Sequence, residues 1–232
     1  MKLRVLLLAL ALAAPGCATT GSDERDPLEG MNRGVLAFND AVDENLLQPA
    51  ARLYRNVTPR PLRDMVRNFF NNIDDLFIGA NNLLQGKPAD AVNDWLRFAF
   101  NTTFGLLGIL DWASDMGLEK HNEDFGQTLA RWGMGDGIYL VLPLLGPSTL
   151  RDTAALPVDW AVDPVTQHSR VDERNAMFAT RLVGRRADLL AASRTLEEAA
   201  LDRYVFLRES FLQRRRSMIY DGEPPRERPP AE

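Results

Sequence analysis

The chain has 232 residues, of which 45% are hydrophobic and 25% charged, so it is long enough to bury a substantial core. These values exclude a collagen-like fibre and a wholly disordered chain. With 27 basic and 32 acidic residues, the net charge of −5 argues against a general nucleic-acid-binding protein. A single cysteine excludes an intramolecular disulfide bond.

The N-terminal segment predicts an export signal rather than part of the fold. Lys2 and Arg4 form a short basic region, and the apolar run from Val5 to Ala14 is too short to span a bilayer. Cys17 follows this run, at the position typical of a bacterial lipoprotein signal. We therefore expect cleavage before Cys17, a diacylglycerol on its thiol and an acyl chain such as palmitate on its amino group.

Two details qualify the anchor. Ala14 and Pro15 stand where the usual lipoprotein signal has Leu and a small residue. The residue after the cysteine is Ala18 and not Asp, which favours the outer membrane of a Gram-negative bacterium over the inner one.

The sequence divides by composition into four parts. We expect a signal peptide over residues 1–16, a lipidated polar tether over 17–26, a helical domain over 27–220 and a Pro-rich disordered tail over 221–232.

Three helices are predicted in the first half of the domain. Apolar residues three and four apart predict a helix over Pro27–Leu47, with Asp26 as its N-cap and a break or kink at Gln48-Pro49. A helix over residues 62–84 has an apolar stripe opposite polar faces, and a third helix runs from Pro88 to about Asn101.

Two interpretations of residues 102–111 stay open. This apolar segment contains Gly105 and Gly108 and lacks polar alternation. It fits a buried strand or tight turn, and it equally fits a mobile apolar loop that contacts lipid or a partner.

The second half of the domain is also mainly helical by its pattern. A short helix is expected around Phe125–Trp132 and two helices over about 171–220, whereas Pro143 and Pro147 argue against a central strand in the apolar run 138–152. The arginines dense after residue 180 form either a solvated face or a contact for anionic lipid headgroups. The fold class is therefore all-α, a multi-helix domain with several non-helical apolar loops.

No combination of residues predicts an active site. His121 and His168 lack further ligands at metal-binding spacing, so His121 is read as a solvated turn rather than a metal ligand. The glycines at 133, 135 and 137 do not form a dinucleotide-binding motif, and Gly146-Pro147-Ser148 is not a lipase elbow. We expect no catalysis, no metal and no cofactor.

Four segments carry a resemblance to a known family. They are DPLEGMNRGVLAFND (26–40), RNFFNNIDDLFIGANNLLQGKPADAVNDWLRFAFNTTFGLLGILDWAS (67–114), EDFGQTLARWGMGDGIYLVLPLLGPSTLRD (123–152) and RYVFLRESFLQRRR (203–216). In this order they resemble the MlaA family, also called VacJ, of outer-membrane phospholipid-transport lipoproteins.

The resemblance implies a ring-shaped helical domain in the inner leaflet of the outer membrane, around an amphipathic channel. It implies removal of mislocalised phospholipids from the outer leaflet, with a trimeric porin and a soluble periplasmic phospholipid carrier as partners. It also implies that Phe38 and Asn39 take part in channel gating and that Gly105 and Gly108 belong to a hinged loop, where the family often has a further glycine in place of Leu107.

Two other functions compete with lipid transport. The chain is alternatively a structural porin-associated envelope lipoprotein without transport, or an outer-membrane lipid hydrolase. Lipid that co-purifies with the protein would separate transport from the structural role, and released fatty acid would indicate the hydrolase.

Overall fold

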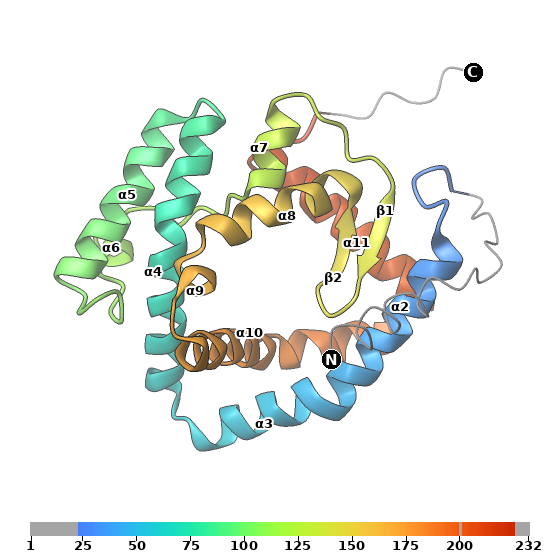
Figure 1. Ribbon diagram of the computed structural model, residues 1–232, viewed down its shortest axis with the longest axis horizontal. Helices are drawn as coiled ribbons and strands as arrows, with labels where there is room; N and C mark the ends of the chain where they lie inside the picture. The colour runs from blue at the N-terminus through green and yellow to red at the C-terminus, as the bar shows by residue number, and fades with distance from the viewer. Residues whose placement is uncertain (1–22, 200, 226–232) are drawn as a thin grey trace.

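Helices predominate in the computed structural model, which describes residues 23–199 and 201–225 (Figure 1). The predicted all-α class is therefore confirmed, with one small two-stranded sheet in addition. The expected signal peptide, Cys17 and residues 226–232 of the expected tail lie outside the described residues.

The first predicted helix continues further than expected. Helix α2 (Glu29–Val42) passes through a π-helical segment (Asp43–Leu47) directly into α3 (Gln48–Val57). Pro49 has no N–H to donate to the turn before it, and that turn is π-helical, with Gln48 N bonded to Asp43 O. The chain thus bends at a widened turn and does not break at the proline.

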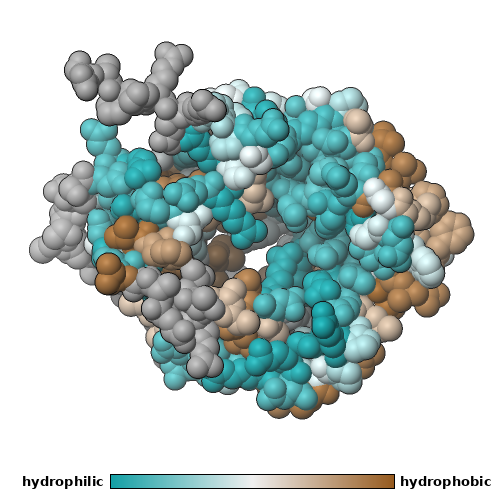
Figure 2. Space-filling model, turned by 180° about the vertical axis from the view of Figure 1, so that it is seen from behind, coloured by the Kyte–Doolittle hydropathy of each residue, from teal (hydrophilic) through white to brown (hydrophobic). Residues whose placement is uncertain are grey.

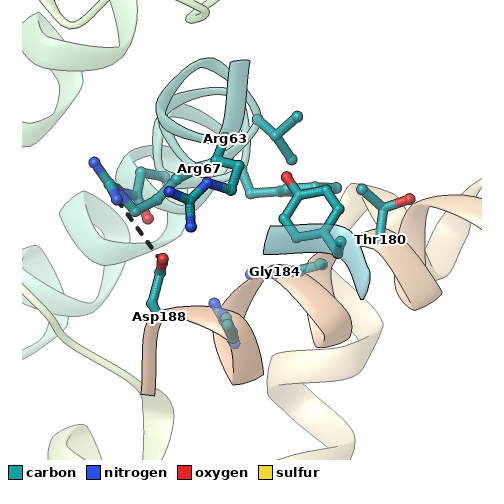
Figure 3. A pocket seen from close by; sticks show the side chains of 11 residues that line it. Arg63, Arg67, Thr180, Gly184 and Asp188 are labelled. Atoms are coloured by element: carbon teal, nitrogen blue, oxygen red, sulfur yellow. Dashed lines mark ion pairs between the residues drawn. The ribbon is translucent and has the colours of Figure 1, made fainter. Parts of the chain in front are cut away.

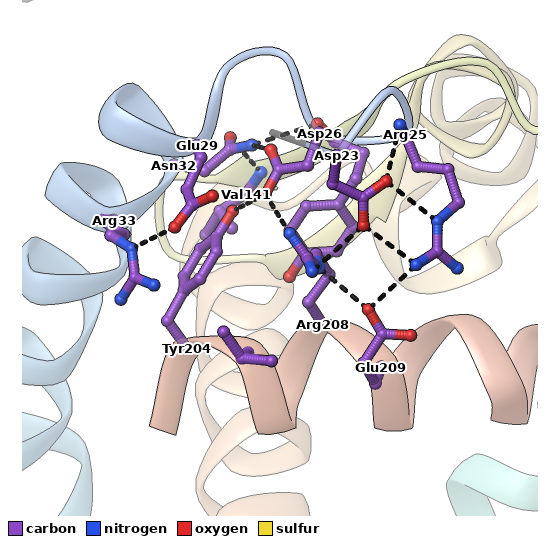
Figure 4. Close-up of polar contacts among 12 residues, drawn as sticks. Asp23, Arg25, Asp26, Glu29, Asn32, Arg33, Val141, Tyr204, Arg208 and Glu209 are labelled. Atoms are coloured by element: carbon purple, nitrogen blue, oxygen red, sulfur yellow. Dashed lines mark hydrogen bonds and ion pairs between the residues drawn. The ribbon is translucent and has the colours of Figure 1, made fainter. Parts of the chain in front are cut away.

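Asp26 does not cap α2 as predicted, because its carboxylate is buried in a polar network. The residue before the helix is Leu28, which makes no side-chain cap. Asp26 instead accepts hydrogen bonds from Asn32 Nδ2 (2.8 Å), from the Tyr204 hydroxyl and from Arg208 Nη1 (3.0 Å) (Figure 4). These contacts fix residues 23–26, the end of the expected tether, onto α2 and α11 (Arg203–Ile219).

Helices α4 (Arg60–Leu84) and α5 (Pro88–Thr103) pack side by side through their polar faces. The periodicity of α4 was predicted correctly, but leucines of its apolar stripe are exposed and its polar residues are buried. The buried polar residues of the two helices are Asn72, Asp75, Asn81, Asn82, Asp94, Arg97 and Asn101.

Charges buried between α4 and α5 are paired, as charges shielded from water must be. Arg97 lies 3.3 Å (Nε) from Asp75 Oδ2 and 3.1 Å (Nη2) from Asp111 Oδ1. His121, expected in a solvated turn, instead has its Nδ1 2.8 Å from Oδ1 of the buried Asp94. The polar face of α4 is therefore an interior surface.

Residues 104–111 and α6 (Trp112–Asp115) follow α5 and expose apolar side chains. Phe104, Leu106 and Leu107 are 65%, 66% and 67% exposed, so this segment is a surface loop and not a buried strand. The interpretation as an exposed apolar loop holds for these side chains, and its mobility stays a prediction.

Helix α7 (Phe125–Arg131) confirms the predicted short helix, and a hairpin follows it. Strands β1 (Tyr139–Leu142) and β2 (Gly146–Thr149) pair antiparallel, with Tyr139 opposite Thr149 and Val141 opposite Pro147. A proline is tolerated here because both strands of a two-stranded sheet are edge strands.

Four helices complete the domain. Sequence patterns did not predict α8 (Leu150–Val162) or α9 (Pro164–Gln167), whereas α10 (Val171–Ala199) and α11 confirm the two predicted helices. Many arginines of α10 and α11 form ion pairs with aspartates of other elements. These arginines connect parts of the fold, a role that neither the solvated face nor the lipid contact considered from sequence includes.

Buried polar side chains and exposed hydrophobic side chains are both numerous in this domain. Among the residues that the structure describes, 16 polar or charged residues are buried, against 12 hydrophobic ones, and 30 large hydrophobic residues are exposed. Figure 2 shows hydrophobic atoms gathered along the edge formed by α5 and α6, and a hollow near the middle bordered by both hydrophilic and hydrophobic atoms.

Candidate functional site

The elements α4, α8, α9, α10, α11 and the hairpin surround a central cavity of about 650 Å³. The hollow seen in Figure 2 lies near the middle of the molecule, where these elements meet in Figure 1. This volume falls in the range of small-molecule binding sites, about 300–1,000 Å³. The cavity is therefore the first candidate for a ligand site.

Charged groups form one part of the cavity wall. Asp124 comes before α7, Asp152 and Asp159 lie on α8, and Arg215 comes from α11. The Arg215 guanidinium is 2.5 Å (Nη1) from Asp124 Oδ2 and 2.9 Å (Nη2) from Asp152 Oδ1. Further charged lining residues are Asp74, Glu123, Asp163, Arg181 and Arg185.

The carboxylates in this wall differ in their protonation. Burial acts to raise the pKa of Asp124, but the hydrogen bonds and charge of Arg215 outweigh it and lower this pKa. Asp159 receives a hydrogen bond from Phe125 N at 3.0 Å, yet burial, with the nearby charge of Asp124, raises its pKa to about 6. Asp159 is thus a carboxylate that changes charge near neutral pH.

Apolar side chains form the other part of the wall. The hairpin turn contributes Leu144 and Leu145, both more than half exposed, and Trp160 reaches the cavity from α8. The remaining apolar lining residues are Phe77, Ile78, Pro147, Leu156, Val162, Phe178, Leu182, Phe211 and Met218. The cavity is therefore amphipathic, with charged and hydrocarbon surfaces facing the same space.

Two asparagines of α2 fix the hairpin that carries this apolar edge. Asn39 donates from Nδ2 to Leu142 O (2.9 Å) and accepts from Leu144 N (2.7 Å) at Oδ1. Asn32, seven residues earlier, accepts from Val141 N at 2.9 Å. Residues seven apart lie on one face of a helix, so α2 holds the hairpin at two points.

The sequence-predicted site residues fall in two places. Asn39 contacts the hairpin turn, whereas its neighbour Phe38 is half exposed. Gly105 and Gly108 are buried where the 104–111 loop meets α4 and α5, away from the cavity lining. A Cβ on Gly105 would lie 2.2 Å from Leu110 O.

Sequence reasoning missed Asn32, Asp159 and Arg215. The seven-residue spacing of Asn32 and Asn39 was a usable signal, because two amides on one helical face indicate a polar contact along that face. Nothing local distinguishes Asp159 from other aspartates. Its raised pKa depends on burial by elements distant in the chain.

The remaining chemical candidates have other partners. Ser148 Oγ lies 3.0 Å from Thr153 Oγ1, and His168 Nε2 lies 2.6 Å from Glu173 Oε2. Within residues 23–199 and 201–225, no group of three or more His, Cys, Asp or Glu side chains is placed to hold a metal ion. In the same part of the chain, no helix is long and apolar enough to cross a membrane.

Comparisons with known proteins agree with this architecture. The family model described as "MlaA lipoprotein" matches residues 24–218. The "Intermembrane phospholipid transport system lipoprotein MlaA" of Escherichia coli K12 is 33% identical over 241 residues, covering 100% of this chain and 95% of that protein. The protein of the same description from Haemophilus influenzae is 33% identical, covering 96% of this chain and 93% of the relative.

A solved structure is similar as well. It is described as "Structural basis for maintenance of bacterial outer membrane lipid asymmetry" and matches with a TM-score of 0.74 at 30% identity, over 84% of this chain and 98% of the other. Sequence and fold thus agree over the whole helical domain, and the chain belongs to the MlaA lipoprotein family.

Proposed function

We propose that this protein is an outer-membrane lipoprotein that removes mislocalised phospholipids from the outer leaflet through its central cavity. It passes them to a soluble periplasmic phospholipid carrier, and so maintains the lipid asymmetry of the outer membrane. Relatives of the chain are described as lipoproteins of an intermembrane phospholipid transport system, and its structural neighbour is described by outer-membrane lipid asymmetry.

The observation that carries the proposal is that polar side chains are buried inside the molecule while large hydrophobic ones are exposed, many of them along one edge. Burying polar groups and exposing large hydrophobic side chains is unfavourable in water, at about 25 cal/mol for each Å² of apolar surface left in contact with it. The same arrangement is favourable when hydrocarbon surrounds the exterior. Exposed Phe104, Leu106, Leu107 and Trp112 are the side chains we assign to acyl-chain contact.

The amphipathic cavity fits the chemistry of a phospholipid. Moving a charged headgroup through hydrocarbon without polar partners is costly, so a transfer path needs a polar surface. The carboxylates and guanidiniums of the wall, among them Asp152 and Arg215, supply that surface, and Leu145 and Trp160 supply an apolar one for the chains.

The anchor and partners complete the proposal. We assign the lipid anchor to Cys17, which lies outside the described residues, and place the domain in the inner leaflet beside a trimeric porin. Asn39, with Phe38, holds the resting state of the channel through the hairpin turn, and Gly105 and Gly108 let the 104–111 loop pack closely and hinge.

The test blocks the cavity in cells. Leu145 is 52% exposed in the cavity wall, and Leu53 on α3 is 62% exposed outside that lining. In cells that lack the resident relative, we expect Leu145→Trp to raise the amount of phospholipid reached by an externally added phospholipase. Leu53→Trp, with the same added volume, should match the wild type.

The control limits what the result can mean. Equal membrane levels of both variants, measured by immunoblot, exclude a loss of protein as the cause. If Leu145→Trp kept surface phospholipid at the wild-type level, passage through this cavity would be contradicted.

A further inference from the structure

A second, smaller pocket lies where α3, α4 and α10 meet, and it is rich in arginine (Figure 3). Its cavity volume is about 40 Å³. A buried site needs roughly 10–15 Å³ on this measure for one water molecule, so the pocket accepts a group larger than that. We call it the α3–α4–α10 pocket. Its charged lining residues are Arg63, Arg67, Arg181, Arg185 and Asp188.

The arginines of this pocket are unequally paired. Arg181 contacts Asp74 and, through Nη1, Asp163 at 2.9 Å, and Arg185 Nη2 lies 3.2 Å from Asp74 Oδ2. Asp74 is therefore shared by the two arginines of α10, and Asp163 is paired with Arg181.

The arginines of α4 are less fully paired. Arg67 contacts Asp64 at 2.7 Å and reaches Asp188 only at 3.8 Å, a distance too long for a hydrogen bond (Figure 3). Arg63 has no carboxylate partner among the side chains that the structure describes, which are those of residues 23–192 and 201–225. The pocket thus has one guanidinium, that of Arg63, free for a ligand, and a second, that of Arg67, whose Nη1 faces Asp188 without a hydrogen bond.

Buried donors converge on the same place. The Tyr54 hydroxyl, Arg63 Nε and Arg181 Nε are all shielded from solvent and receive no acceptor from the described residues. A buried donor without an acceptor costs about 1–3 kcal/mol, and native structures contain few of them. Three such donors lining one pocket indicate that its ligand is an acceptor with several oxygens.

The charge around the pocket favours an anion over water. Arg181 and Arg185 lie close enough to contact the same carboxylate, that of Asp74, so their like charges repel. A negative group beside these arginines would relieve that repulsion. Guanidinium groups match the oxygen spacing of phosphate, which accepts several hydrogen bonds at once.

We propose that the α3–α4–α10 pocket binds a phosphate group, either that of a phospholipid headgroup or inorganic phosphate. The headgroup source rests on the proposed transport function. It is supported by position, because Arg181 and Arg185 line both this pocket and the central cavity. A headgroup in the central cavity therefore meets the same two arginines that border the pocket.

The experiment measures binding to the full-length lipidated protein in maltoside micelles by isothermal titration calorimetry. The probes are dihexanoylphosphatidylglycerol, dihexanoylglycerol, which lacks the phosphate, and inorganic phosphate. The variants are Arg63→Gln, Tyr54→Phe and Asp188→Asn. Arg55→Gln is the matched control, since Arg55 is an exposed arginine of α3 outside the pocket lining.

Each variant has its own expected result. Arg63→Gln should weaken phosphatidylglycerol binding about tenfold or more, because a charge-assisted hydrogen bond is lost. Tyr54→Phe should weaken it several-fold without lowering the melting temperature, because the hydroxyl has no acceptor among the described residues. Asp188→Asn should tighten binding, because it removes the carboxylate that competes for Arg67, and Arg55→Gln should bind like the wild type.

The ligands separate the two sources of phosphate. Tighter binding of phosphatidylglycerol than of inorganic phosphate supports a headgroup site, and the reverse order supports a site for the free anion. Equal binding of phosphatidylglycerol and dihexanoylglycerol, or affinities unchanged in Arg63→Gln and Tyr54→Phe, would overturn the proposal. Lipid transport is read separately by surface phospholipid in cells, so a chain that transports lipid without binding phosphate here refutes the pocket alone.

Discussion

Asp159 is a carboxylate whose charge works against the fold at neutral pH. Its pKa is about 6 in the fold, against an ordinary value of 3.8, and burial is the main cause. A raised pKa means that the folded state binds the proton more tightly than the unfolded chain. The stabilising effect of that proton is complete below pH 3.8 and is lost as the pH rises through about 6.

This sign gives a prediction for Asp159→Asn. The amide keeps an oxygen for the hydrogen bond from Phe125 N but carries no charge. We expect the variant to exceed the wild type in unfolding free energy by about 1 kcal/mol at pH 8, a value reduced for partial solvation, and by little or nothing at pH 4. Thermal unfolding in detergent at both pH values measures this, and a gain at pH 4 equal to that at pH 8 would contradict the account.

The burial of several polar residues of α4 was not predictable from the sequence. Asn72, Asp75 and Asn82 are typical of a solvated helix face, yet they are buried against α5. The residue pattern of α4 shows that the helix has an apolar face and a polar face. Hydropathy only ranks these faces by their preference for water. It does not indicate which face meets water when the surroundings differ, so the orientation of the helix was not predictable.

At the scale of elements, α2 and the hairpin act as one unit. Asn39 bonds both Leu142 O and Leu144 N, across a turn in which Leu144 has a left-handed backbone (φ 64°). These hydrogen bonds hold the turn, and with it Leu145, in the cavity wall.

Removing the Asn39 side chain should release this turn. Each lost hydrogen bond costs about 0.5–1.5 kcal/mol, so we expect amide hydrogen exchange at Leu144 to become about fivefold faster or more in Asn39→Ala. The control is Asn45→Ala, whose amide bonds only Ala41 O in the neighbouring helical turn. Unchanged exchange in Asn39→Ala would show that other contacts hold the hairpin.

The 104–111 loop requires a glycine at position 108 both for its left-handed backbone and for its close packing against α4. Gly108 has φ +87°, and a Cβ there would lie 2.5 Å from Asn72 Cβ. Gly86 has φ +80° with nothing within 4 Å of its Cβ position. A side chain at either position would strain the left-handed backbone, but only a side chain at Gly108 would also collide with a neighbour, Asn72.

The two alanine variants separate these effects. Gly86→Ala should lower the unfolding free energy by about 1 kcal/mol, the cost of a left-handed backbone. Gly108→Ala should cost clearly more, because α4 must also move away from the loop. Denaturant titration of both variants measures the difference. Equal losses would mean that the loop is not packed tightly against Asn72.

Helices with regular apolar spacing were predictable, as was the short helix α7, whereas α8, α9 and the hairpin were not. The periodicity of α4, α5, α10 and α11 indicated each of them from sequence. Helix α8 contains Pro157 and has no clear polar face, and the hairpin strands are four residues each with a proline opposite Val141, so neither gave a periodic signal. Tertiary contacts with α2, α7 and α11 define them instead.

At the scale of the whole molecule, the positions of polar and apolar side chains fit the proposed lipid transport. Buried ion pairs such as Arg97–Asp75 and Arg215–Asp124 lie inside, and large apolar side chains lie outside and along one side of the cavity. The family resemblance predicted a channel, but residue patterns did not predict its wall. Its lining comes from five helices, the hairpin and the segment 122–124, which only the tertiary structure brings together.

The most direct test of the central claim is reversible closure of the cavity. Cys17 is the only cysteine and carries the proposed anchor, so Leu145→Cys introduces a single free thiol. Protein in vesicles is treated with a bulky methanethiosulfonate reagent, and transfer of labelled phospholipid to a soluble carrier is measured. The account predicts that treatment slows transfer about tenfold or more, that reductant restores it, and that Leu53→Cys is unaffected. Transfer that continues at full rate through modified Leu145→Cys protein would contradict passage through the central cavity.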